Sequence, residues 1–229
     1  MPFIGYIPFF VGLAVSLGAQ LLVSLTFRRY SRLPAASAYS GFSAARRLLD
    51  KQGLSGVAIE QTGGNLSDHY DPRRKILRLS QSTYAATSVA AIGVAAHETG
   101  HAVQDRDHFI FNRIRSALLL PANIGSMAGP YLAGLGFVLD GLWSRLLIQF
   151  GIGLFAASVL FYLITLPIEF DASRRAVRML EDTGILGAEE LKGARKVLRA
   201  AALTYVASAA VSVLYFFRLS GMASSRNRR

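Results

Sequence analysis

The chain has 229 residues, 52% of them hydrophobic and 17% charged, and a formal net charge of +11 at pH 7. This composition excludes an ordinary soluble enzyme, and the absence of cysteine excludes both disulfides and thiolate zinc ligands. A basic chain can bind nucleic acid, but we find no nucleic-acid motif. In a membrane protein, lysine and arginine hold cytoplasmic loops beside anionic headgroups, so we expect a lipid bilayer and no nucleic acid as partner.

Four uncharged apolar stretches approach or exceed the roughly 18 residues that a membrane-spanning helix needs. We therefore predict a mainly α-helical, polytopic membrane protein of about four transmembrane helices, forming a single domain over residues 1–229. The first stretch lacks a basic region before it, and Arg28 and Arg29 follow in place of a cleavage site, so a retained helix is expected rather than a signal peptide. The predicted spans are 2–27, 116–139, 146–168 and 200–217.

The positive charges predict the orientation of these spans. Residues 28–115 carry 13 Lys and Arg and residues 169–199 carry 7, against 1 in residues 140–145. Cytoplasmic loops are enriched in Lys and Arg. We therefore place 28–115 and 169–199 in the cytoplasm as the catalytic segments, with the N-terminus outside.

A polar stretch follows the first span. Residues 43–52 are typical of a short amphipathic helix that stops at Gly53. Residues 57–61, 66–70 and 75–80 are typical of strands, the last two joined by a turn, and we expect a small cytoplasmic antiparallel sheet. This sheet could offer an edge to an extended peptide, or it could simply cover the neighbouring helix.

The strongest motif is His97-Glu98-Thr-Gly-His101, in a helix predicted over residues 82–105. Positions i and i+4 share one helix face, so His97 and His101 can bind one ion. Two imidazoles suit Zn²⁺, and Glu98 can polarise a zinc-bound water as a general base. We therefore expect Zn²⁺ as cofactor, with Glu98 as the catalytic residue.

A catalytic zinc needs a third protein ligand and an open position. His69 lies in the predicted hairpin and could be a ligand or a donor to a developing oxyanion. Asp140, in Leu-Asp-Gly, resembles the zinc ligand of intramembrane site-2-type proteases, but the predicted topology puts it on the opposite side of the membrane from the histidines. Glu169 ends an apolar span on the same side as the histidines, where ionisable groups are functional by default. His108 and Asp171 are the remaining candidates.

The segment Glu169-Phe-Asp-Ala-Ser-Arg-Arg-Ala176 resembles a segment of the HtpX and CAAX-prenyl-protease clan, in which the leading Glu is the third zinc ligand. Together with the Asp-His-Tyr-Asp-Pro run at 68–72 and the placement of the His-Glu-Thr-Gly-His motif, the whole chain resembles the bacterial YugP-like family of neutral zinc metallopeptidases. The clan has Asp where this chain has Ser173, so Asp171 or another residue would have to orient the histidine.

This resemblance implies a gluzincin-like, membrane-bound zinc metalloendopeptidase in the bacterial cytoplasmic membrane, with its active site facing the cytoplasm. Its substrates would be membrane or cytoplasm-facing polypeptides, and analogy with HtpX suggests membrane protein quality control. The alternative is a non-proteolytic membrane scaffold or assembly factor with a structural or vestigial zinc site. A degenerate site would be expected to have lost Glu98, which this chain keeps. Nothing in the sequence specifies an oligomeric state.

Overall fold

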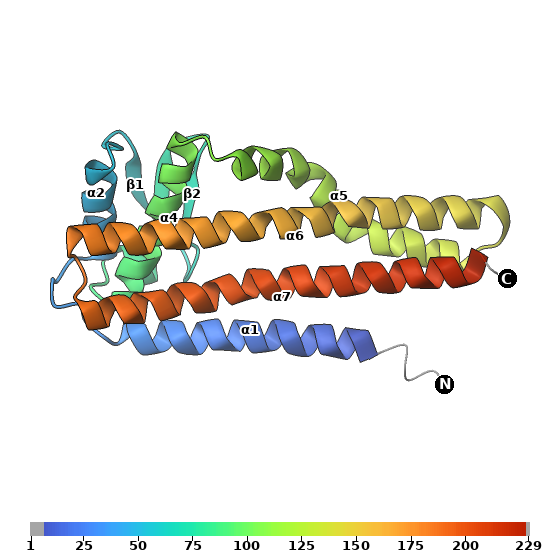
Figure 1. Ribbon diagram of the computed structural model, residues 1–229, viewed down its shortest axis with the longest axis horizontal. Helices are drawn as coiled ribbons and strands as arrows, with labels where there is room; N and C mark the ends of the chain where they lie inside the picture. Colours follow the sequence, from blue (N-terminus) through green and yellow to red (C-terminus); the bar gives the residue numbers. More distant parts are fainter. Residues whose placement is uncertain (1–6, 228–229) are drawn as a thin grey trace. The chain divides into compact units, whose positions relative to one another are not determined.

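The computed structural model describes residues 7–227, and helices dominate it (Figure 1). The mainly α-helical class with a small sheet is confirmed. The elements in chain order are α1 (Ile7–Ser31), α2 (Gly41–Lys51), β1 (Ala58–Thr62), β2 (His69–Asp71), β3 (Ile76–Ser80), α3 (Gln81–Tyr84), α4 (Val89–Arg106), α5 (Ile110–Val138), α6 (Gly141–Thr183) and α7 (Ala188–Asn227).

The chain divides into two compact units. Unit 1 lies within residues 1–18, 113–167 and 204–229, and unit 2 comprises residues 19–112 and 168–203. Three of the four long helices have a length and composition suited to crossing a membrane, whereas the sheet and the motif helix α4 belong entirely to unit 2.

Within residues 7–227, the helices long and apolar enough to cross a membrane are α1, α6 and α7. They contain the predicted spans 146–168 and 200–217 and the described part of 2–27, whose residues 2–6 lie outside the described chain. The predicted span 116–139 is helical within α5 but is not among the three. Pro121, Asn123 and Pro130 lower the hydropathy of that stretch.

Unit 1 is built from closely packed helices with apolar outer surfaces. A Cβ added at Gly125 of α5 would overlap the carbonyl oxygen of Leu154 in α6, so only glycine allows this approach. Large side chains such as Leu120, Met127 and Phe150 are exposed. Exposed apolar side chains on closely packed helices fit an environment of lipid rather than water.

Helix α6 continues well beyond the apolar stretch that it contains. The predicted span ends at Ile168, but the helix continues through Glu169 and ends at Thr183, directly before Gly184. Ala172 and Ala176 are fully buried in this continuation, while Arg174 and Arg178 are exposed. The continuation is therefore an amphipathic helix with one face in the core of unit 2.

The sheet of unit 2 has the strand order β1-β3-β2. β2 pairs with β3 in antiparallel fashion, as predicted, but β1 pairs with β3 in parallel, so the prediction of a fully antiparallel sheet was wrong. β3 carries the fully buried Leu77 and Leu79, and burial of these side chains favours the central position. The chain therefore runs from β1 at one edge of the sheet to β2 at the other edge, and then returns to β3 at the centre.

Helix α4 lies at the centre of unit 2, beside α2, β2 and β3 (Figure 1). The side chain of Ser88 accepts a hydrogen bond from the Ala91 amide, so the helix begins at Val89 rather than at 82 as predicted, and residues 81–84 form the separate helix α3. Ile92, Ala95 and Ala96 are fully buried. Small residues on α4 let its neighbours approach closely on several sides.

Candidate metal centre

Two adjacent helices of unit 2 bring the three predicted zinc ligands together. His97 and His101 project from one face of α4, and Glu169 projects from α6. One ligand atom from each lies within 4.8 Å of the other two. The Oε2 atom of Glu169 is 3.2 Å from Nε2 of His97 and 3.7 Å from Nε2 of His101. Both histidines therefore present the same ring nitrogen to one carboxylate oxygen.

This donor set fits a zinc ion. Two imidazole nitrogens and one carboxylate oxygen are the ligands of a common catalytic zinc site, which leaves one position open for water. Glu169 is only 3% exposed, and a buried carboxylate is costly unless a positive group neutralises it. Among the described residues its ion-pair partners are these two histidines alone.

The outer nitrogens of both rings also have partners. Nδ1 of His97 is 3.2 Å from the hydroxyl oxygen of Ser173, and Nδ1 of His101 donates to the Oε1 atom of Gln104 at 3.0 Å. A partner on Nδ1 orients the ring and leaves Nε2 free to bind a metal. In the sequence, Ser173 is notable only as a departure from the related clan, and no sequence pattern indicates Gln104.

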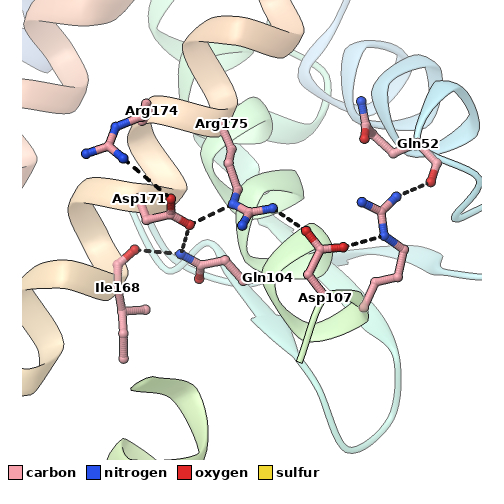
Figure 2. Close-up of polar contacts among 8 residues, drawn as sticks. Gln52, Gln104, Asp107, Ile168, Asp171, Arg174 and Arg175 are labelled. Carbon is pink, nitrogen blue, oxygen red and sulfur yellow. Dashed lines mark hydrogen bonds and ion pairs between the residues drawn. The ribbon is translucent and has the colours of Figure 1, made fainter. Parts of the chain in front are cut away.

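A chain of polar contacts explains the orientation of Gln104. Its Nε2 atom donates to the Ile168 carbonyl at 2.8 Å and to the Asp171 carboxylate at 3.0 Å (Figure 2). Its Oε1 atom is therefore left to accept from His101. Asp171 was predicted to act near the metal ligands. Asp171 accepts a hydrogen bond from Gln104, and Gln104 in turn is hydrogen-bonded to His101.

Arginines anchor this chain of contacts on its outer side. Arg175 donates to Asp171 at 2.6 Å and to Asp107 at 2.5 Å (Figure 2). Arg106 donates to Asp107 at 2.9 Å and to the Gln52 carbonyl. The hydrogen bonds from Arg106 and Arg175 lower the pKa of Asp107 below its usual range. These hydrogen bonds connect the C-terminal end of α4 to α6 and to Gln52, the residue that follows α2.

Gly100, inside the motif, sets how closely α4 and α6 approach. A Cβ at this position would lie 2.6 Å from the carbonyl oxygen of Ala172, a distance that real Cβ atoms essentially never show. A larger residue would push α6 away from α4 and move Glu169 with it. The motif therefore needs a glycine here for packing.

Glu98 is buried, with 7% of its surface exposed, and among the described residues its carboxylate has no hydrogen-bond partner in the protein. Burial raises its pKa, and the negative charges of Glu169 and Asp68 add to this effect, whereas His97 and His101 oppose it. A raised pKa brings a carboxylate closer to the range in which it accepts and returns a proton near neutral pH.

Among the described residues, the other predicted candidates do not belong to this group. His69, on β2, is exposed, and its Nδ1 atom is 2.9 Å from the Ser67 carbonyl oxygen. Its role as an oxyanion donor stays a prediction. Asp140 lies between α5 and α6 and pairs with Arg226 at 2.8 Å within unit 1. His108 lies in the turn after α4, with φ of 51°.

Comparisons with known proteins identify the family of this chain. A family model described as "Putative neutral zinc metallopeptidase" matches residues 5–224. The chain is 43% identical over 206 residues to "Putative membrane protease YugP" of Bacillus subtilis (strain 168), and the match covers 90% of each chain. No solved structure matches the chain. Since the family match spans nearly the whole chain, including the helices suited to a membrane, this protein is a membrane protein that belongs to that zinc metallopeptidase family.

Proposed function

We propose that this protein is a membrane-bound, zinc-dependent metalloendopeptidase in which His97, His101 and Glu169 hold Zn²⁺. The observation that carries the proposal is the convergence of these three side chains in unit 2, beside a buried Glu98 that makes no hydrogen bond to the described protein. Residues 1–229 would form one membrane-embedded metallopeptidase domain.

In the mechanism, Zn²⁺ when bound supplies a Lewis acid for the peptide carbonyl and lowers the pKa of water. Glu98 accepts the proton of the attacking water and returns it to the departing amine. Its raised pKa suits both steps, since the group must gain and lose a proton in each cycle. Ser173 and Gln104 hold the two imidazoles in place, so the ligands need not reorganise during the reaction.

We also propose that the site faces the cytoplasm, in the cytoplasmic membrane of a bacterium. Support comes from the concentration of Lys and Arg in residues 28–115 and 169–199, the segments that carry the site. Substrates would then be membrane or cytoplasm-facing polypeptides, and removal of damaged membrane proteins is the role that we favour.

The scaffold alternative is less well supported. A zinc site kept only for structure needs its ligands but has no use for a further carboxylate whose pKa is raised by burial, because burial of a charged group costs stability. Glu98 is such a carboxylate.

The decisive variant is Glu98→Gln, compared in detergent with wild type and with Glu189→Gln, a change at an exposed carboxylate of α7. Zinc content would be measured by atomic absorption, and cleavage with a quenched fluorescent peptide library. We expect about one zinc per chain in all three proteins, and cleavage lowered by roughly 10²–10⁴-fold in Glu98→Gln alone. Undiminished cleavage by this variant would exclude the mechanism. Zinc binding without cleavage by wild type would favour the scaffold.

A further inference from the structure

A second feature of unit 2 lies on the face of α6 next to the metal ligands. Helices α6 and α7 enclose a groove of about 610 Å³. Arg174 and Arg178 line it from α6, and Arg195 and Arg199 line it from α7. Ser173, which contacts His97, also borders the groove. The proposed peptidase mechanism gives no role to the groove itself.

The groove is strongly cationic. Its one lining carboxylate, Glu181, pairs with Arg195. Arg174 is 63% exposed in its side chain and lies 3.9 Å from Asp171, at the limit of an ion pair. Among residues 7–227, Arg178 and Arg199 have no carboxylate partner.

The spacing of the arginines is itself unfavourable. Arg174 and Arg178 are at positions i and i+4 of α6, and Arg195 and Arg199 have the same spacing on α7. Like charges at this spacing destabilise a helix. An anion bound between the helices would relieve both repulsions. Guanidinium groups bind phosphate with two parallel hydrogen bonds, so phosphate is the anion that this arrangement suits best.

One end of the groove is apolar. Phe170 and Leu203 line it, although they are 44% and 46% exposed. In the sequence, Phe170 follows the apolar stretch of α6, and Leu203 lies within that of α7. Arg174 lies four residues after Phe170, and Arg199 lies four residues before Leu203, about 6 Å along each helix.

We propose that this groove is a binding site for an anionic phospholipid, with Arg178 and Arg199 on the phosphate and Phe170 and Leu203 against an acyl chain. Apolar contact at Phe170 and Leu203, and positive charge about one to two turns farther along each helix, match the order of groups along a phospholipid. Basic pockets between membrane helices on the cytoplasmic side are known to take such headgroups. The proposal stands independently of peptidase activity, because it needs neither zinc nor Glu98.

The test is native mass spectrometry of the full chain in detergent, titrated with phosphatidylglycerol or with phosphatidylcholine of the same acyl chains. The double variant Arg178→Gln, Arg199→Gln would be compared with Arg28→Gln, Arg29→Gln, which removes the same charge beside the α1 span. We expect wild type and the control to prefer phosphatidylglycerol by about tenfold or more, and the groove variant to lose this preference. Equal loss in both variants, or no preference in wild type, would overturn the proposal.

A second set of measurements separates lipid from other anions. Leu203→Ser keeps every charge, and it should weaken binding of long-chain but not short-chain phosphatidylglycerol. Glycerol phosphate, which has the headgroup without chains, should compete at least tenfold less well than the lipid. Equal competition would assign the groove to a soluble phosphate. Arginine-dependent binding of polyglutamate in place of the lipid would assign it to an acidic peptide.

Discussion

Within unit 2, helix α6 has two faces that handle charge in opposite ways. On the face toward α4, the carboxylate of Glu169 is buried, and all its described partners are histidines. On the groove face, Arg178 is exposed and has no carboxylate partner among the described residues. Water stabilises an exposed guanidinium, but a buried carboxylate depends on its neighbours. The buried face therefore requires a cation, whereas the exposed face only attracts an anion.

The largest effect that tests this comparison is expected from Glu169→Ala, matched with Glu181→Ala on the groove face of the same helix. Loss of one of three ligands should reduce bound zinc from about one per chain to near zero. Glu181→Ala should leave zinc unchanged, because its carboxylate pairs with Arg195 outside the metal group. Metal analysis after dialysis measures both. Full zinc in Glu169→Ala would move the third ligand elsewhere.

A smaller effect is expected from Gln104→Leu, which keeps the size of the side chain but removes the acceptor for His101. Loss of such an outer partner lowers metal affinity by about 10–100-fold. Gln52→Leu is a matched control, because Gln52 contributes its backbone carbonyl to the contact with Arg106. Competition with a fluorescent zinc chelator would measure both affinities. An unchanged affinity in Gln104→Leu would show that the network in Figure 2 supports the fold and not the metal.

The most gradual effect concerns pH. Burial opposes the charged form of His101, but the hydrogen bond and negative charge of Glu169, together with Glu98, outweigh it and raise its pKa to about 9. In the metal-free protein this imidazole is therefore protonated at pH 7, and zinc must displace the proton. We expect zinc affinity to rise about tenfold per pH unit from pH 7 to 9. The same chelator assay measures this slope, and a flat response would show that His101 is already neutral.

The sequence predicted those parts of the site that lie close together along the chain. His97, Glu98 and His101 share one helical turn, so their spacing alone predicts a common face. Glu169 was predicted from its place at the end of an apolar stretch and from a family resemblance. Gln104 could not be predicted in this way, because its orientation depends on Ile168 and Asp171, 64 and 67 residues away.

The sheet and the helix ends show a similar limit. Alternating apolar residues predicted the strands, but the parallel pairing of β1 with β3 depends on which strand is buried deepest in unit 2. The predicted end of the α6 span was placed where charges begin. The helix continues because Ala172 and Ala176 pack in the core while the charged side chains face outward, a pattern that hydropathy alone does not reveal.

The distance along the chain between the ligands has a consequence for biosynthesis. His97 and Glu169 are 72 residues apart, and at about 5–20 residues per second the ribosome adds Glu169 some 4–14 s after His97. During that interval the growing chain holds the two histidines without their carboxylate. The predicted span 116–139 and the apolar part of α6 are also made before Glu169. A nascent chain therefore carries no complete proposed metal site until the predicted span 116–139 and the apolar part of α6 have been synthesised.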